Sequence, residues 1–242
     1  MRGAIGVMKK KIISLIILPF FLFASDNEIS VDQSGATANI DLEQLGSGNI
    51  IGGSDATAGD MTALDLDGIT MTLDINQIGS SNQFLGDILA DSFTGFFEFT
   101  GDSNIFDINV DKDNTYGADD SNLNIQVTGD SNEFTLNQAT SALASTLDLD
   151  WTINGSSNEI TSNINYDLAT NYMDIDGSDN TVNFTASGYQ GGYFYLDHTG
   201  GSRTFNITQS STLDNDWLKI ISIGSNGTVC VIQNDGGTST SC

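Results

Sequence analysis

Proline is nearly absent from this chain of 242 residues, in which the only proline is Pro19. Because proline cannot donate a backbone hydrogen bond to a neighbouring strand, a long proline-free sequence suits nearly continuous β-sheet. Histidine is equally rare: His198 is the only one, and no Gly-x-Ser-x-Gly sequence occurs. A Ser-His-Asp hydrolase would depend on this one histidine, which falls inside a structural repeat. We therefore predict that the protein is not an enzyme.

Basic residues are also scarce, and their distribution divides the chain. Four of the seven lie before residue 25, whereas all 32 acidic residues lie after it. Residues 26–242 thus carry three basic and 32 acidic side chains, a formal charge of −29. Nucleic acid and anionic membrane surfaces are excluded as expected partners, because both would repel so acidic a chain.

The N-terminal segment resembles an export signal. Lys9, Lys10 and Lys11 precede a mostly apolar run at 12–23, which is followed by the small residues Ala24 and Ser25. This order is typical of a signal peptide, and the apolar run is too short for an ordinary membrane span. We predict that residues 1–25 are a signal peptide, with Met8 as the alternative start. The mature chain is expected to be secreted, extracellular or on the cell surface, without a membrane span.

A short polar turn, Gly-x-x-Asn, recurs along the rest of the chain. After the copy at 129–132, Phe134, Leu136 and Gln138 alternate with polar residues. A period of two is typical of a half-buried strand, and glycine and asparagine both tolerate the positive φ of a tight turn. The clear copies are Gly46–Asn49, Gly79–Asn82, Gly101–Asn104, Gly129–Asn132, Gly155–Asn158 and Gly177–Asn180, and looser copies begin at Gly200 and Gly224.

The spacing of these turns predicts the fold. From Gly79 onward the leading glycines are separated by 22, 28, 26, 22, 23 and 24 residues. Repeats of this length are typical of one supersecondary unit stacked on its neighbours. We predict an all-β fold, a single β-solenoid of strand-turn-strand repeats over 26–233, with two flattened sheets. Loops are expected near 52–68, 86–92 and 111–121, and a C-terminal tail at 234–242.

The repeat resembles the curlin repeat of bacterial curli fibres, written Ser-x5-Gln-x-Gly-x2-Asn-x-Ala-x3-Gln. Its centre is matched by 44–49 and 77–82, which begin with Gln44 and Gln77. Its second half is matched by the segments that end in Gln138, Gln209 and Gln233. The resemblance implies a secreted subunit of an extracellular amyloid fibre, stacked as a β-solenoid and used in adhesion or biofilm matrix.

The chain departs from that pattern in the position two residues before the turn glycine. In the other copies this position holds Phe99, Val127, Ile153, Ile175, His198 and Ser222. Glutamine and asparagine ladders help to hold stacked strands in register. A chain with broken ladders could be a minor or nucleating subunit, a subunit that polymerises differently, or a solenoid that stays monomeric.

Two further groups of residues are candidate sites. Asp111, Asp113, Asp119 and Asp120 offer the oxygen ligands that calcium prefers, but Gly117 and Asn122 do not fit the EF-hand spacing. We expect a solvated acidic loop, with no cofactor and calcium only as a weak alternative. The only cysteines, Cys230 and Cys242, are predicted to pair within one chain, as exported cysteines usually do; links between subunits and free thiols are the alternatives.

The sequence thus favours a curlin-like structural protein, a subunit or nucleator of an extracellular fibre. Its expected partners are further copies of itself or other curlin-like subunits, and a dedicated outer-membrane secretion apparatus. The alternative is a monomeric, acidic β-solenoid that acts as a surface adhesin or virion-associated fibre protein, with or without bound calcium. A polysaccharide-cleaving solenoid is the third hypothesis, but no pair of carboxylates stands out for it.

Overall fold

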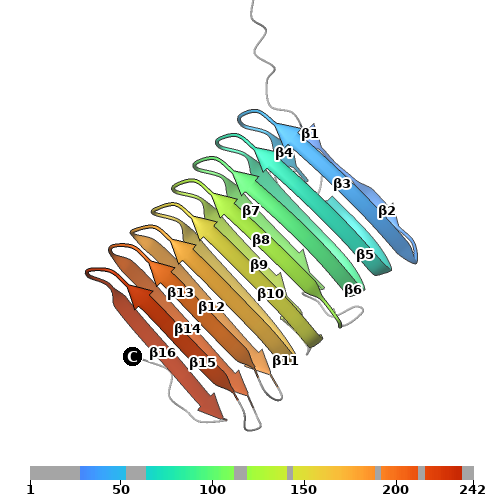
Figure 1. The fold of residues 1–242 in the computed structure, drawn as a ribbon. Coiled ribbons are helices and arrows are strands. Elements are labelled where there is room, and N and C mark those ends of the chain that lie inside the picture. The colour runs from blue at the N-terminus through green and yellow to red at the C-terminus, as the bar shows by residue number, and fades with distance from the viewer. Residues whose placement is uncertain are drawn as a thin grey trace, which may run out of the picture.

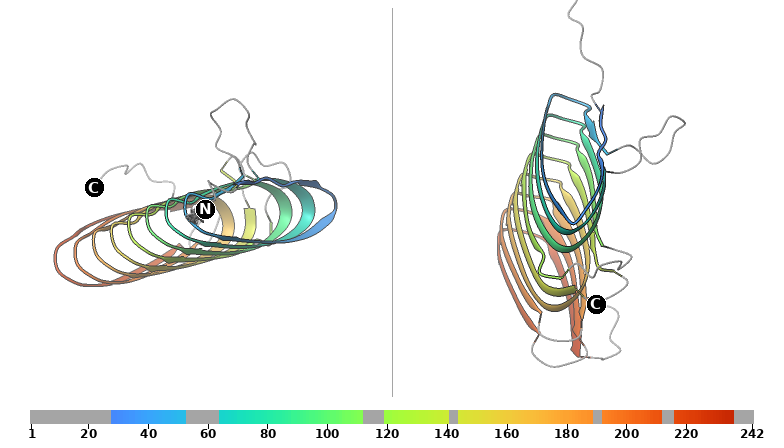
Figure 2. Two further views of the ribbon diagram at one scale, coloured as in Figure 1. Left: turned by 90° about the horizontal axis from the view of Figure 1, so that it is seen from above. Right: turned by 90° about the vertical axis from the view of Figure 1, so that its right-hand side faces the viewer.

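The chain folds into a β-solenoid of about seven turns, as the spacing of the glycine turns predicted. A computed structural model describes residues 28–52, 64–111, 119–140, 144–188, 192–211 and 216–235. Figure 1 shows the coils stacked side by side, with β1, β2 and β3 at one end and β15 and β16 at the other. Seen along the stack, each coil is a flattened oval (Figure 2). The predicted signal peptide lies outside the described residues, which contain no helix long and apolar enough to cross a membrane.

Each coil contributes one strand to each of two parallel sheets. The pre-turn sheet contains the strands that end at a turn glycine: β3 (Thr37–Leu45), β8 (Asn122–Thr128), β10 (Ala144–Asn154), β13 (Tyr193–Thr199), β15 (Trp217–Ile223) and the second halves of β5 (Leu64–Ile78), β6 (Gln83–Thr100) and β11 (Glu159–Asp176). These strands pair in register, so residues at one position in successive coils form a row along the stack.

The post-turn sheet contains the strands that follow the turns. They are β1 (Glu28–Ile29), β2 (Asp32–Ser34), β4 (Ile50–Ile51), β7 (Ile105–Val110), β9 (Glu133–Gln138), β12 (Asn180–Gly188), β14 (Arg203–Ser211), β16 (Thr228–Asp235) and the first halves of β5, β6 and β11. Inward side chains of the two sheets meet in one continuous apolar core. Alternate residues of the strands inside the stack are buried, as the period of two predicted.

The basic coil is 22 residues long, and the longer coils from Gly101 onward carry their extra residues at the bend opposite the glycine turns. In the coil that begins at Gly46 the extra residues instead fall between Gly52 and Leu64, within the post-turn strand. The two coils that begin at Gly79 and Gly155 have this length, and in both a single strand of 18 residues runs through that bend. The predicted loop at 86–92 was therefore wrong: these residues belong to β6, because a coil of minimum length has no residues to spare for a loop.

The loop predicted at 52–68 is partly strand as well: residues 64–68 already belong to β5, and 53–63 lie outside the described residues. Within the loop predicted at 111–121, the described residues 111 and 119–121 are not strand, and 112–118 lie outside the described residues. At the C-terminus, β16 extends to Asp235, so the first two residues of the predicted tail are strand.

Candidate functional site

The glycine turns form a ladder in which backbones touch. A Cβ atom on Gly129 would lie 2.0 Å from the carbonyl oxygen of Gly101, and one on Gly155 would lie 1.9 Å from that of Gly129. These glycines also have φ of 139° and 151°, a region that favours glycine. The prediction that these turns need glycine for its conformation is confirmed. The sequence did not reveal that each glycine is also needed for close contact with the neighbouring coil.

The second positive φ of the turn was assigned to the wrong residue. It falls on the residue before asparagine, as in Ser81, Ser103, Ser131, Ser157 and Asp179, whose φ values are 58–61°. The asparagine itself points inward and is buried. Its side chain is thereby free to bond the next coil, which an exposed turn residue could not do.

The asparagines form a directional hydrogen-bond ladder along the stack. The side-chain oxygen of each asparagine accepts a hydrogen bond from the backbone N–H of the asparagine one coil nearer the N-terminus. The first of these bonds is donated by Asn49 to Asn82 at 2.9 Å, and the last is donated by Asn158 to Asn180 at 2.9 Å. The intermediate bonds are donated by Asn82, Asn104 and Asn132 and accepted by Asn104, Asn132 and Asn158. The ladder ends at Arg203, because a guanidinium has no acceptor; it donates instead to the carbonyl of Asn226.

The glutamines of the repeat motif lie in three separate parts of the stack. Gln77 donates to Gln44 at 2.8 Å inside the first coils, and Gln233 donates to Gln209 at 3.5 Å in the last ones. Gln138 is fully buried between Val110 and Ile164 of the adjoining coils. Neither its amide nitrogen nor its oxygen has a hydrogen-bond partner among the described residues, so Gln138 points inward, as the alternation predicted, but forms no rung of a glutamine ladder.

His198 occupies a structural position, as its place in the repeat predicted. It lies in register between Ile175 and Ser222, is fully buried, and its ring nitrogens lie 3.0 Å from Ser222 Oγ and 3.1 Å from the Gly177 carbonyl oxygen. Burial lowers the pKa of the imidazole, against an opposing contribution from the Gly177 carbonyl; Arg203 also lowers it. The neutral ring is therefore favoured in the folded chain.

We expect acid to weaken the C-terminal coils through His198. The unfolded chain takes up the proton first, so the stabilisation is complete above the ordinary histidine pKa and is lost as the pH falls through it. The thermal midpoint should fall more between pH 7 and pH 5 in the wild type than in His198→Gln, which keeps a hydrogen-bonding group. Equal falls in the two proteins would contradict this. The wild type must be compared with the variant because Asp150 and Asp174 stabilise the folded chain as the pH falls, which opposes the effect of His198. Their pKa values are raised by burial and by neighbouring aspartates.

The predicted acidic loop contains no metal site that the described residues can show. Asp111 is buried, whereas Asp119 accepts a hydrogen bond from the backbone N–H of Ser145 at 2.6 Å; Asp113 lies outside the described residues. No cluster of three or more metal-ligating side chains is present in the described part of the chain.

Cys230 is disulfide-bonded, and Cys242, its predicted partner, lies outside the described residues.

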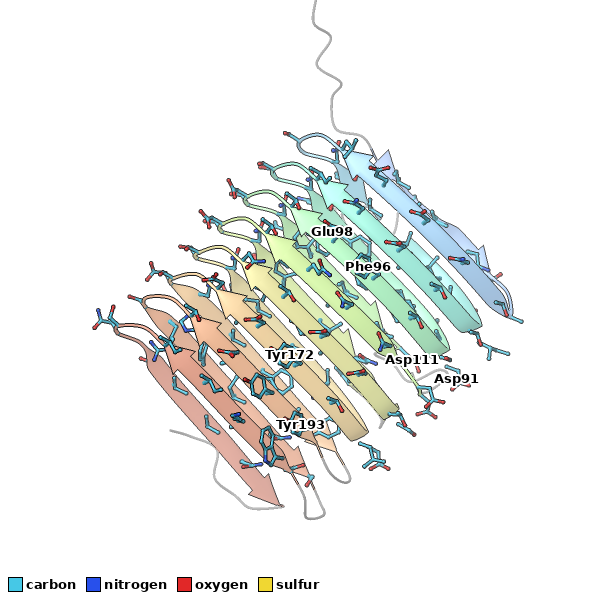
Figure 3. The ribbon with its side chains drawn as sticks, viewed as in Figure 1. Asp91, Phe96, Glu98, Asp111, Tyr172 and Tyr193 are labelled. Atoms are coloured by element: carbon cyan, nitrogen blue, oxygen red, sulfur yellow. The ribbon has the colours of Figure 1, made fainter. Side chains whose placement is uncertain are left out.

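An aromatic patch on the outer surface of the pre-turn sheet was not predicted from the sequence. Tyr172 stacks on Tyr195 with ring centroids 5.0 Å apart, Tyr193 stacks on Trp217 at 4.1 Å, and the Lys219 ammonium lies 5.1 Å from the Tyr195 ring centroid. Tyr172 and Tyr193 project from the face turned toward the viewer in Figure 3. Aligning the copies on their turn glycines would have revealed these pairs, because each pair falls in one row.

The two ends of the stack expose apolar side chains, both in rows that face the core and in the outward row just before the turn glycine. Val229 and Val231 lie in the rows of the buried Phe205 and Ile207, yet they are 43% and 38% exposed. The outward row just before the turn glycine is apolar only toward the two ends of the stack. Leu45 and Ile78 are 59% and 39% exposed at the N-terminal end, and Ile223 is 63% exposed at the C-terminal end. Polar residues fill the row between them: Thr100, Thr128, Asn154, Asp176 and Thr199.

Each end also presents strands with an unpaired edge. Among the described strands, β3 pairs only with β5, and β15 pairs only with β13. An unpaired edge beside exposed apolar side chains is a template for a further strand. The two ends, rather than a cleft on one side, are therefore the candidate functional site. Comparison with protein-family models, curated proteins and solved structures found no match.

Proposed function

We propose that the protein is a secreted structural subunit that joins end to end with further copies of itself into an extracellular fibre. The observation that carries this proposal is the pair of open ends, where the hydrogen-bonding edges of both sheets and apolar core rows reach solvent. A contact between two different ends of the same molecule does not close on itself, so it can repeat without limit. The curlin-like spacing of the turns supports the same function.

The two ends match when the glycine turns of neighbouring copies are kept in line. Following the row assignments, β15 of one copy would face β3 of the next, with Leu218 beside Ile40, Ile220 beside Leu42 and Ile223 beside Leu45. Both partners in each pair are apolar. The joint would continue the core and would bury the exposed row before the turns.

Charge also favours this arrangement. Arg203 and Lys219, two of the three basic residues after position 25, lie in the last two coils. The first pre-turn strand carries Asp41 and Glu43. In the aligned joint, Lys219 of one copy lies in the row of Asp41 of the next, which brings opposite charges together in an otherwise acidic protein.

A charge-exchange cycle tests the proposal. Lys219→Asp places two carboxylates in one row across the joint, and Asp41→Lys places two ammonium groups there, so each should slow fibre elongation. The double variant restores opposite charges and should recover most of the lost rate. Asp74→Lys, one coil inside the N-terminal end and in the same row, controls for net charge. Slowing by both single variants without recovery in the double variant would contradict the aligned joint.

Binding by a monomer is the second candidate, and the aromatic patch favours it. Four exposed or half-exposed rings beside Asp174 and Asp197 offer both apolar and acidic contacts on a flat sheet. Such a surface suits a cationic ligand better than an anionic one. Retention of a soluble monomer at all concentrations would favour this function over fibre formation.

A further inference from the structure

The stack of coils begins and ends on the same sheet, which leaves it with an extra half-coil. The post-turn sheet has a continuous path of nine strands, from β1 to β16. The pre-turn sheet runs from β3 to β15 and has eight. The first strand of the post-turn sheet is formed by residues 28–34, that is, by β1, β2 and the residues between them, and its last strand is β16.

Residues 28–34 act as one strand that covers the next coil. β1 pairs with β4 and β2 pairs with β5. Between them the carbonyls of Ile29 and Val31 accept backbone hydrogen bonds from Gly52 at 2.7 Å and Asp65 at 3.0 Å. The edge of β4 and β5 is thus occupied by residues 28–34, whose own outer edge, like that of β3 beside it, has no partner among the described strands.

This offset prevents a seamless joint between two intact copies. If β16 of one copy pairs with residues 28–34 of the next, β15 and β3 are separated by the width of one missing strand. If β15 pairs with β3, then β16 and residues 28–34 compete for the same edge of β4 and β5. One strand must leave before both sheets can continue across the joint.

β16 presents the same inward side chains as the strand with which it competes. The register relates Val229 to Ile29 through the row that contains Ile51, Phe84 and Phe205. It relates Gln233 to Gln33 through the row that contains Leu66 and Gln209. Val231 corresponds likewise to Val31, beside Leu64. The inward sequence is Ile-x-Val-x-Gln in one strand and Val-x-Val-x-Gln in the other.

We infer that assembly proceeds by strand replacement: β16 of one copy displaces residues 28–34 of the next from the edge of β4 and β5. This inference rests on the proposed end-to-end function and specifies its contact. Residues 28–34 form a removable cap that occupies the edge of β4 and β5 until another copy binds. The exchange keeps the number of paired strands on the post-turn sheet and adds the pairing of β15 with β3. The joined state is therefore favoured over the separate copies.

Disulfide trapping in mixed fibres distinguishes the replaced from the retained cap. Ile232 of β16 lies in the outward row that contains Asp65 and Asp32. Neighbouring strands are about 4.8 Å apart, within disulfide range. Fibres grown from Ile232→Cys and Asp65→Cys subunits should form intermolecular disulfides between these positions, identified by mass spectrometry. Fibres from Ile232→Cys and Asp32→Cys should not. The reverse pattern would overturn the replacement.

A cap locked in place supplies a second, kinetic test. The variant Asp32→Cys/Asp65→Cys can form a disulfide between in-register neighbours and should, when oxidised, add to wild-type seeds at least about tenfold more slowly, because β16 cannot reach its edge. Reduction should restore the rate. Thr135→Cys/Thr161→Cys, an equivalent pair in the interior of the same sheet, is the matched control and should elongate normally when oxidised.

The outcomes separate the two proposals. Normal elongation by the oxidised, locked variant would overturn strand replacement and leave fibre formation standing. Failure of the wild type to assemble under any condition would overturn both. Wild-type chains treated with the same reductant control for loss of the disulfide at Cys230.

Discussion

Gly79→Ala should lower the free energy of unfolding by about 3 kcal/mol or more and prevent normal coil stacking, because both its conformation and its space require glycine. Gly79 has φ of 147°. An added Cβ would lie 1.2 Å from the carbonyl oxygen of Gly46, and a backbone atom cannot turn aside as a flexible side chain would. The damage should spread beyond one turn, since coils in a solenoid are stabilised chiefly by their neighbours.

Chemical or thermal unfolding of residues 26–242 measures this effect. Ser80→Ala is the matched control: Ser80 is the next residue of the same turn and its side chain is exposed, so its loss should change stability by less than about 0.5 kcal/mol. A Gly79→Ala variant as stable as Ser80→Ala would contradict the close approach of neighbouring turns.

Gln138→Leu should have a large effect of the opposite sign and stabilise the protein by about 1–3 kcal/mol. The amide of Gln138 is fully buried beside Val110 and Ile164 and lacks partners among the described residues. Leucine is of similar size and removes the cost of burying two unsatisfied polar atoms. The thermal midpoint of the variant should therefore rise.

The same substitution at Gln77 is the control and should destabilise. Its amide nitrogen donates to Gln44 at 2.8 Å, so Gln77→Leu leaves a buried polar partner without that bond. Opposite signs at two glutamines of the same repeat would show that stability depends on neighbours in the stack. A loss of stability in Gln138→Leu would instead mean that the amide makes a contact that the described residues lack.

Much of this fold could be predicted because the repeat combines two strong local signals. Glycine turns mark where each strand ends, and alternation marks which side chains face the core. Together they gave the correct rows, including the one that relates Gln44 to Ser222. The length of the basic coil could have been recognised as well, since two spacings equal 22 residues.

The parts that failed depend on contacts between coils. The expected loop at 86–92 is part of the continuous strand β6, which the glycine and aspartates there concealed. The placement of positive φ before asparagine follows from a hydrogen bond to another coil, which one repeat alone does not reveal. The aromatic patch and the extra half-coil likewise emerge only when the rows are aligned across the whole stack.

The unequal coil lengths have a structural explanation in this arrangement. From Gly101 onward the extra residues enter at the bend opposite the glycine turns, where an insertion leaves the register of both sheets unchanged. In the coil that begins at Gly46 they enter between Gly52 and Leu64, and the pairing resumes in register on either side. Insertion at the glycine turn would break the close backbone ladder and the asparagine bonds at once. The chain can therefore vary one edge of the solenoid while keeping both ends able to pair.

The central claim is that the open ends join copies of the same chain, and concentration-dependent assembly tests it most directly. Purified residues 26–242 would be followed by thioflavin-T fluorescence across a concentration series, with negative-stain electron microscopy of the end points. We expect a lag that shortens with concentration and with added seeds, and unbranched fibres in which coils stack along the axis. Compact monomers that persist at every concentration, with or without calcium, would contradict the account.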